Sequence, residues 1–293
     1  MRARRLGEAT TARLMVAPYA IGTVLLLALP ALVTLTLALT EYDLITAPSF
    51  TGLSNFGDLL DDPAFGDAMV ATLVFLGFAV PLRVGGALAL ALLLHRGFRF
   101  AGAHRTAAYL PSVVPDVAIA LVWLFLANPL YGPIPILFGA VGLPAPDLLT
   151  TGPGAVALTV LISAFALGEG FIIALAVRRE LPEELYELAR VEGASPLYTF
   201  RRLTLPLMAP TLALLTCRDV GLSLQFAFVP ALLVTEGGPD RATTFLPLLV
   251  YRNAFENGRY GYASAMTVVT FALTLLVVAA QLRVLRRGRL ALD

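Results

Sequence analysis

Residues 183–210 read EELYELARVEGASPLYTFRRLTLPLMAP, a polar segment with several prolines that lies between two long apolar stretches. The whole chain has 293 residues, of which 58% are hydrophobic and only 14% are charged, and its mean hydropathy is +0.81. A soluble domain normally has about 25% charged residues. The composition therefore indicates an integral membrane protein, and residues 183–210 are expected to form a loop on one side of the membrane.

Six apolar stretches are long enough to cross a membrane as helices, since about 20 residues span roughly 30 Å of hydrocarbon. The first stretch is too long for the apolar core of a signal peptide and no small-residue cleavage site follows it, so we expect a retained span. The predicted fold is all-α: one transmembrane domain over residues 1–293, a six-helix bundle with a polar loop at 178–210. The predicted spans are 15–39, 67–94, 107–127, 154–177, 211–234 and 260–283.

The arginines predict how this bundle is oriented. The two chain ends and the loops 95–106 and 178–210 together hold 16 arginines, whereas the alternate loops hold three, all within 235–259. Because positive residues concentrate on the cytoplasmic side, both termini and the 178–210 loop are predicted to be cytoplasmic. The three external arginines are expected to bind a partner protein or nearby acidic residues. They are Arg241, Arg252 and Arg259, and the acidic candidates are Glu236, Asp240 and Glu256.

Two compositional features exclude particular chemistries. The chain has no lysine, because all 21 basic residues are arginine. A Walker A loop needs a lysine to reach the phosphates of a nucleotide, so ATP hydrolysis by that route is not expected. The single cysteine, Cys217, lies in an apolar stretch and excludes an internal disulfide and a cysteine-based metal site. No metal site is predicted.

The sequence of the polar loop predicts two short helices. Pro182 suits the start of a helix, where its missing N–H would have no partner, and the helix dipole favours the acidic residues that follow. Gly193 ends this helix and Pro196 lies just beyond it. Apolar residues then return at helical spacing, so the helices are expected to join at Ala194–Ser195. The expected apolar contacts are Tyr186, Leu197, Tyr198 and Phe200.

Two environments are open to this loop: it could lie on lipid headgroups as an amphipathic hairpin, or it could bind another protein. A hairpin on the membrane surface would turn five carboxylates toward anionic lipid, and it would not need a Gly–Pro break. A protein partner is therefore favoured. The carboxylates are those of Glu180, Glu183, Glu184, Glu187 and Glu192.

The loop also carries a spaced motif: Glu187-Leu188-Ala189, then Gly193, then Leu203-Thr204-Leu205-Pro206. This resembles the pattern E-A-A, three residues, G, nine residues, I-x-L-P, which is the EAA loop of permease subunits in binding-protein-dependent ABC importers. The resemblance implies coupling helices that dock into a groove on a separate ATPase subunit. The residues it implies for this contact are Glu183, Glu184, Tyr186, Glu187, Ala189, Gly193, Ala194, Phe200, Leu205 and Pro206.

Further segments resemble the carbohydrate-uptake permeases of the maltose and glycerol-phosphate type, and the similarity covers roughly residues 14–285. They are Phe50–Phe65, Tyr109–Trp123, Thr235–Phe255 and the GYASA at 261–265. The resemblance implies a multi-pass protein of the bacterial plasma membrane, surrounded by lipid, that binds no nucleic acid. It also implies a second homologous permease, an ATPase dimer and an extracytoplasmic sugar-binding protein as partners. ATP and Mg would bind only to the ATPase, so this chain would hold no cofactor and would not be an enzyme.

Five ionisable residues fall well inside the predicted spans, where facing lipid would cost several kcal/mol each. One interpretation is a structural ion pair between helices, with Arg83 bound to Glu169 or Asp116. The other is a sugar site, in which the Glu169 carboxylate accepts hydroxyl hydrogen bonds and the Phe171 ring faces a sugar. The five residues are Arg83, Asp116, Glu169, Arg218 and Asp219. The resemblance to carbohydrate permeases implies that this stretch and the middle of the fifth span contact the sugar, so the candidate contacts are Gly168, Glu169, Phe171, Ser223, Gln225 and Phe226.

The function expected from these features is transmembrane passage of a carbohydrate or related polyol, coupled to ATP hydrolysis on another subunit. Two alternatives remain at this point. A proton-coupled secondary transporter would use the carboxylates of Asp116, Glu169 or Asp219 as proton carriers and would need no nucleotide. A membrane scaffold or sensor would use the 183–210 loop only to recruit a partner.

Overall fold

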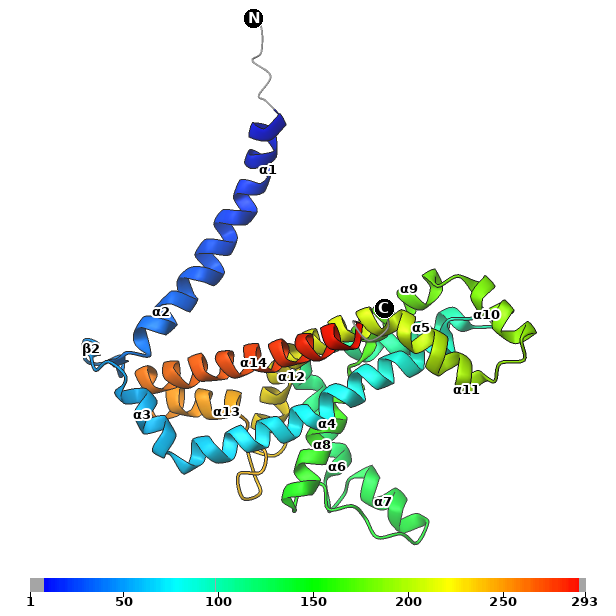
Figure 1. Cartoon of the computed structure of the whole chain (residues 1–293). Helices are drawn as coiled ribbons and strands as arrows, with labels where there is room; N and C mark the ends of the chain where they lie inside the picture. Colours follow the sequence, from blue (N-terminus) through cyan, green and yellow to red (C-terminus); the bar gives the residue numbers. More distant parts are fainter. Residues whose placement is uncertain (1–7, 98, 290–293) are drawn as a thin grey trace, which may run out of the picture. The chain divides into compact units, whose positions relative to one another are not determined.

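The computed structural model describes residues 8–97 and 99–289, and nearly all of their regular structure is helical (Figure 1). The predicted all-α class is confirmed. Within these residues, four single helices are long and apolar enough to cross a membrane, and two bent helix pairs raise the number to six if each pair is one span. The arginines at positions Arg2, Arg4 and Arg5, used to predict orientation, lie outside the described residues.

Each of the six predicted apolar stretches overlaps one of these segments. The single helices are Arg13–Leu37, Pro63–Leu94, Pro196–Leu233 and Tyr260–Arg283, and the bent pairs are Ala101–Val113 with Asp116–Ala127 and Gly152–Phe165 with Gly168–Glu180.

The elements follow one another along the chain with two short strands near the N-terminal end. In order they are α1 (Glu8–Thr23), the π-helical turn η1 (Val24–Ala28), α2 (Leu29–Leu37), β1 (Thr40–Glu41), β2 (Ser49–Phe50), α3 (Ser54–Asp61), α4 (Pro63–Leu94), α5 (Ala101–Tyr109), the 3-10 turn η2 (Leu110–Val113), α6 (Asp116–Ala127), α7 (Pro133–Ala140), α8 (Gly152–Phe165), α9 (Gly168–Glu180), α10 (Glu183–Val191), α11 (Pro196–Thr199), the π-helical turn η3 (Phe200–Thr204), α12 (Leu205–Leu233), α13 (Leu246–Tyr251), the π-helical turn η4 (Arg252–Glu256) and α14 (Tyr260–Arg289).

The chain forms two compact units, which we describe separately. The first unit comprises Met1–Asp62 and Val250–Phe271, and the second comprises Pro63–Leu249 and Ala272–Asp293. The first unit contains the β1–β2 pair, and the second contains the helices that carry the membrane-depth charges.

In the first unit, polar contacts hold the loop after α2 against the start of α14. Asn55 donates a hydrogen bond from Nδ2 to the carbonyl of Thr40 at 2.9 Å. Gly261 lies against that same carbonyl, where a Cβ atom would overlap the oxygen. The hydroxyl of Tyr262 donates to Oδ2 of Asp62 at 2.7 Å. Close approach of two backbones therefore explains the glycine that opens the GYASA segment.

The core of the second unit lies where α4 packs against α8, α9 and α12. The rings of Phe75 on α4 and Phe245 have centroids 4.9 Å apart, and both side chains are fully buried. The hydroxyl of Thr72 accepts a hydrogen bond from the backbone N–H of Leu246 at 2.9 Å. Membrane helices associate through close packing, which small residues permit. The buried alanines of α4 supply this contact; they are Ala68, Ala79, Ala87 and Ala91.

The predicted continuous span at 107–127 is wrong in shape, because the chain bends by 98° between Val113 and Asp116. Val114 is extended, with ψ of 134°, and Pro115 follows it. A residue before proline is pushed away from the helical region by the proline ring, so the helix ends here. Asp116 consequently begins α6 and does not lie in the middle of a helix.

The predicted span at 154–177 is also broken, by a 50° bend between α8 and α9. A break inside a membrane leaves backbone groups without partners unless other side chains satisfy them. The N–H of Gly168 is bound by Oγ of Ser112 at 2.9 Å, and the carbonyl of Ser163 accepts from Nη1 of Arg83 at 2.8 Å. Side chains from two other helices therefore stabilise both sides of the bend.

Candidate coupling loop and charged helix face

The polar loop folds as two short helices, as its sequence predicts. The first, α10, ends before Gly193, which has φ of +74° and lets the chain turn. The hydroxyl of Ser195 then caps α11 by accepting from the N–H of Tyr198 at 3.3 Å. From Pro196 the helix continues through η3 into α12. The π-helical turn lies directly before Pro206, where a regular helix would bring the proline ring against a carbonyl of the preceding turn.

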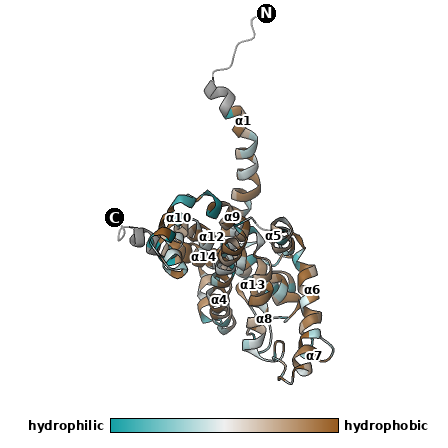
Figure 2. Cartoon of the chain, turned by 90° about the vertical axis from the view of Figure 1, so that its right-hand side faces the viewer, coloured by the Kyte–Doolittle hydropathy of each residue, from teal (hydrophilic) through white to brown (hydrophobic). Residues whose placement is uncertain are grey.

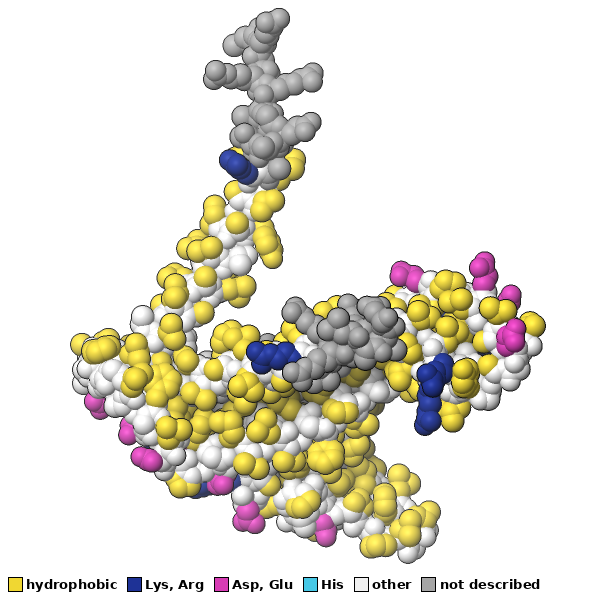
Figure 3. Space-filling view, in the orientation of Figure 1, with side chains coloured by type: hydrophobic (Ala, Val, Ile, Leu, Met, Phe, Trp, Pro, Cys, Tyr) yellow, Lys and Arg dark blue, Asp and Glu magenta, His cyan; other side chains and the backbone are white. Residues whose placement is uncertain are grey.

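The outer surface of this loop combines acidic and apolar side chains. Figure 2 shows hydrophilic residues over α10, and Figure 3 shows acidic side chains gathered over the same helix beside hydrophobic ones. Glu183, Glu184 and Glu187 are exposed, as are Gly193, Leu205 and Pro206. A surface of this mixed kind fits a protein partner. The large exposed apolar side chains are Leu185, Leu188, Val191, Leu197 and Tyr198.

Tyr186 lies on the inner side of the loop, where it is 8% exposed. Its ring lies under the guanidinium of Arg178 at 4.1 Å, and its hydroxyl donates to Oγ1 of Thr204 at 3.2 Å. This ring anchors the loop to α9 and η3, so Tyr186 is an apolar contact inside the loop and not part of its outer surface. Three further residues of the predicted surface are half-buried: Ala189, Ala194 and Phe200.

At the root of the loop, Arg178 is buried and faces an imidazole. His95 Nε2 lies 3.3 Å from Nη2 of Arg178, and Nδ1 of His95 lies 2.7 Å from the carbonyl oxygen of Leu92. Burial, together with the charges of Arg178 and Arg96, lowers the pKa of His95 below its usual value. A neutral imidazole with a proton on Nδ1 fits both contacts, because Nε2 can then accept from the arginine.

The buried charges of the second unit pair differently from the prediction. Arg83 Nε donates to Oδ2 of Asp219 at 2.9 Å, and both side chains are nearly fully buried. The guanidinium also lies 4.7 Å from the ring centre of Phe226. Arg83 thus joins α4, α8 and α12. The predicted pairing of Arg83 with Glu169 or Asp116 is wrong, because the bend at Gly168 turns Glu169 toward another arginine.

Glu169 forms an ion pair with Arg218, which links the first turn of α9 to the middle of α12. The side chains are 52% and 33% exposed, so the pair lies on an open face of the second unit. Gln225 is two helical turns after Arg218, on the same face of α12, and it is exposed as well. We call Glu169, Arg218 and Gln225 the charged helix face.

The other candidate sugar contacts lie in different surroundings. Phe171 is fully buried in the core between α4 and α12, so its ring faces no cavity. Gly168 packs so closely against α5 that a Cβ would meet the backbone of Tyr109. Ser223 is fully buried, and its hydroxyl has no hydrogen-bond partner among the described residues. Phe226 is half-buried beside Arg83. Sequence reasoning grouped these residues by their positions in two spans, but they lie on different faces of α9 and α12 and therefore differ in burial.

The three arginines predicted to be external make some of the contacts expected of them. Within the first unit, Arg252 lies 3.9 Å from Glu256, and Arg259 stacks 4.1 Å over the ring of Tyr262. Within the second unit, Arg241 pairs at 3.7 Å with Asp67, a partner that the sequence did not indicate. In the loop that follows α2, hydrogen bonds from the N–H and the hydroxyl of Thr46 and from the N–H of Ile45 lower the pKa of Asp43.

Residues 82–289 match the family model described as "Binding-protein-dependent transport system inner membrane component". The chain belongs to this family. It is 31% identical over 268 residues to "Probable ABC transporter permease protein YesP" of Bacillus subtilis strain 168, covering 89% of this chain and 86% of that one. It is 30% identical over 272 residues to the "sn-glycerol-3-phosphate transport system permease protein UgpA" of Agrobacterium fabrum, covering 92% of each.

A solved structure has the same fold. A chain of the bacterial alginate ABC transporter, solved in complex with alginate pentasaccharide-bound periplasmic protein, gives a TM-score of 0.79. The match covers 97% of this chain and 98% of that chain at 22% identity. The predicted membership of an ABC importer permease family is confirmed. The chain is a multi-pass transport component, which fits the prediction that it is not an enzyme.

Proposed function

We propose that this permease takes up a carbohydrate or related polyol delivered by an extracytoplasmic binding protein. The relatives support this class, because one is named for sn-glycerol-3-phosphate and the alginate transporter was solved with a sugar-bound periplasmic protein. The external segments Phe50–Phe65 and Thr235–Phe255 add to this support through their resemblance to carbohydrate permeases.

The charged helix face is the observation that supports the proposed transport path. Glu169 lies about 16 Å from the C-terminal end of α9, and Arg218 lies about 20 Å from the start of α12, so both are at membrane depth. Charged side chains at that depth face protein or water, because lipid would penalise them. We infer that a second, homologous permease lies opposite this face and that the substrate passes between the two.

Substrate contacts are proposed on the same face. Glu169 and Gln225 offer acceptors for hydroxyl groups, and Phe226 lies on the next position of α12. Gly168, Phe171 and Ser223 are proposed to act indirectly, through the packing that holds α9 and α12 at this bend. The buried hydroxyl of Ser223 would become a direct contact only if α12 rotates during transport.

The 178–210 loop is proposed to dock on an ATPase subunit in the cytoplasm, with both chain termini on that side. The exposed residues of α10 and α11 would form the contact, and Tyr186 would transmit movement to α9 and η3 through Arg178 and Thr204. ATP and Mg would bind to the ATPase dimer alone. Closure of that dimer on ATP would move the loop and turn the permease pair outward, so the chain itself makes and breaks no bond.

Reconstituted vesicles test this function against its alternatives. We expect uptake of sugar only when ATP lies inside with the ATPase and the binding protein lies outside. Uptake driven by a proton gradient without nucleotide would instead establish the secondary transporter. A permease that bound partners but moved no substrate under any condition would establish the scaffold.

Gly193 allows a controlled test of the docking loop. Gly193→Asp should abolish ATP-driven uptake and weaken ATPase co-purification, because it adds a charged side chain at an open, positive-φ turn of the docking surface. Gly142→Asp is the matched control, since Gly142 also has a positive φ (+73°) and open surroundings but lies in a predicted external loop. Equal losses in both variants would mean that backbone strain, rather than docking, causes the defect. Glu187→Lys should reproduce the loss without any strain.

Cysteine labelling tests the proposed orientation. Cysteines at Asp240 and Arg252, placed in a chain whose Cys217 is replaced by alanine, should react with impermeant reagents from outside the cell only. A cysteine at Leu197 should react only after the membrane is opened. The reverse pattern would invert the topology.

A further inference from the structure

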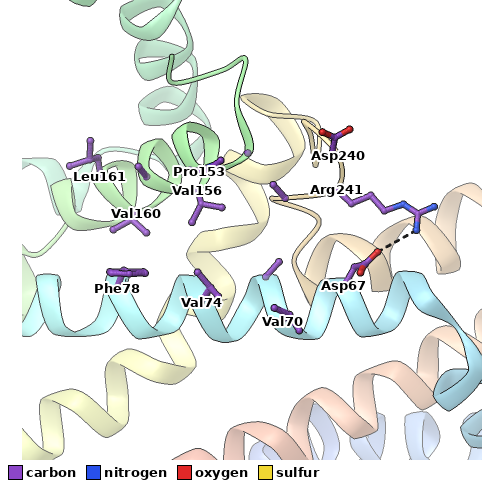
Figure 4. A pocket seen from close by; sticks show the side chains of 14 residues that line it. Asp67, Val70, Val74, Phe78, Pro153, Val156, Val160, Leu161, Asp240 and Arg241 are labelled. Atoms are coloured by element: carbon purple, nitrogen blue, oxygen red, sulfur yellow. Dashed lines mark ion pairs between the residues drawn. The ribbon is translucent and has the colours of Figure 1, made fainter. Parts of the chain in front are cut away.

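An open apolar groove of about 880 Å³ runs between α4 and α8 in the second unit (Figure 4). On α4 it is lined by Val70, Val74 and Phe78, which are four residues apart and share one face of the helix. The facing wall comes from α8, where the side chains of Val156 and Val160 point toward those of α4. The lining residues of that wall include Pro153, Val156, Val160 and Leu161.

Charged side chains gather at one end of this groove only. Asp67, Asp240 and Arg241 lie there, whereas Phe78 and Leu161 lie at the other end (Figure 4). From Asp67 to Phe78 the α4 axis rises by about 16 Å, and half of the hydrocarbon layer is about 15 Å thick. The groove therefore has the length of one leaflet, with its charges at the depth of the headgroups.

This length favours a lipid chain over a helix of another subunit. A membrane-spanning helix extends through both leaflets, and it would contact α4 and α8 well beyond Phe78. An acyl chain begins at the headgroup and ends near the middle of the bilayer, as the groove does.

The charges at the mouth indicate which headgroup fits. Arg241 Nη1 lies 3.7 Å from Oδ2 of Asp67, and both side chains are about 60% exposed. Exposed pairs of this kind are weak, so the arginine can turn to a phosphate at little cost. Asp240 also lines the mouth, and no ion pair involves it among the described residues. One cation and two carboxylates match a headgroup that has both a phosphate and an ammonium group.

We propose that this groove binds an acyl chain of a phosphatidylethanolamine, whose phosphate contacts Arg241 while its ammonium group contacts Asp67 and Asp240. A primary ammonium donates three hydrogen bonds to such carboxylates, as a lysine does. The methylated ammonium of phosphatidylcholine has no N–H to donate. Phosphatidylglycerol is anionic and has no ammonium group, so the two carboxylates at the mouth would repel it while one arginine attracts it. The selectivity is therefore for ethanolamine. This inference concerns the lipid-facing side of α4 and α8 and goes beyond the proposed transport function.

A photoreactive phosphatidylethanolamine with a diazirine in its acyl chain provides the direct test. The full-length permease, purified as the complex it forms, is reconstituted with the probe, irradiated and digested. Labels are expected on the peptides that contain Val70–Phe78 and Pro153–Leu161. Unlabelled phosphatidylethanolamine should compete better than phosphatidylcholine or phosphatidylglycerol with the same chains. Labels spread evenly over the apolar belt would show ordinary boundary lipid and would overturn the proposal.

Two variants separate the acyl site from the headgroup site. Val74→Trp fills the groove and should remove the labels, whereas Val122→Trp, on an exposed position of α6, should not. Arg241→Gln leaves the groove open and should reduce the preference for ethanolamine by about fivefold, as expected for one exposed charged contact. If the groove peptides cross-link to a second permease in the wild-type protein, a helix is the occupant and the lipid assignment fails. An unchanged preference in Arg241→Gln would equally refute the headgroup contacts.

Discussion

Arg218 and Asp219 are neighbours in the sequence, yet α12 turns them into opposite environments. Asp219 points inward and binds Arg83 at 2.9 Å, with side chains 8% and 5% exposed. Arg218 points to an open face, where its pair with Glu169 is 33% and 52% exposed. Successive residues of a helix lie about 100° apart, so a single residue step separates the two faces. Two ion pairs between an arginine and a carboxylate, at a similar depth in the membrane, thus serve different purposes.

The difference in burial decides how much each ion pair contributes to the stability of the fold. Removing one partner of a buried pair strands the other charge and costs about 3–5 kcal/mol. An exposed pair contributes about 0–1 kcal/mol, because solvent screens it. Arg83–Asp219 is therefore expected to hold helices together, and Glu169–Arg218 to act on whatever passes the open face. The following changes test that division, from the largest effect to the smallest.

Asp219→Asn should produce the largest loss of stability. The change removes the carboxylate that binds Arg83 directly and leaves its guanidinium with the Ser163 carbonyl and the Phe226 ring, so the thermal midpoint and the yield of folded protein should both fall. The double change Arg83→Gln with Asp219→Asn should recover part of the loss, because no charge is then stranded. Thermal unfolding in detergent measures both. Asp147→Asn, at an exposed aspartate, is the matched control and should melt like the wild type.

Glu169→Gln should leave stability almost unchanged and impair transport. The pair is half exposed, so its loss changes the free energy of unfolding by about 1 kcal/mol at most. If the carboxylate binds substrate hydroxyl groups, losing its charge weakens that contact, and substrate-stimulated ATPase activity should fall more than basal activity. Normal transport with a lowered melting point would contradict the division between the two pairs. Arg218→Gln should resemble Glu169→Gln, whereas adding Arg83→Gln should give no rescue.

The contrast between these pairs could not be obtained from the sequence. Hydropathy predicts where the apolar stretches lie, because membrane helices must be long and apolar, and each of the six predicted stretches overlaps a candidate span. The loop motif predicted the family, and Gly193 predicted the turn. Partner choice among five membrane-depth charges depends on helix rotation and bends, which a linear pattern of apolar residues does not encode.

One of the two bends nevertheless has a signal in the sequence. Pro115 restricts the residue before it, which is enough to predict a break in the third stretch. The second break has no proline, and it depends on Ser112 and Arg83, which satisfy backbone groups from far away in the sequence. Such a long-range contact has no local signature. The burial of Tyr186 has no local signature either, because it depends on Arg178 in the preceding helix.

Arg178 is a second buried arginine to compare with Arg83. Unlike Arg83, it has no close carboxylate in the described part of the chain, because the nearest one, Glu183, is 4.0 Å away. It is satisfied instead by the ring of Tyr186 and by His95, whose pKa is lowered by burial and by the neighbouring arginines. A lowered pKa in the folded state means that the neutral imidazole stabilises the fold above the ordinary histidine pKa of about 6.5. As the pH falls below that value, the unfolded chain takes up the proton first and this contribution is lost. The thermal midpoint of the wild type should therefore fall as the pH is lowered from 7.5 to 5.5, and this fall should be smaller than the one caused by Asp219→Asn.

His95→Gln should remove this part of the pH dependence, because glutamine accepts a hydrogen bond from Arg178 without titrating. His104→Gln, at an exposed histidine that makes a comparable backbone contact, is the control and should retain it. If His95→Gln melts with the full pH dependence of the wild type, the imidazole is not the group that titrates at the root of the loop.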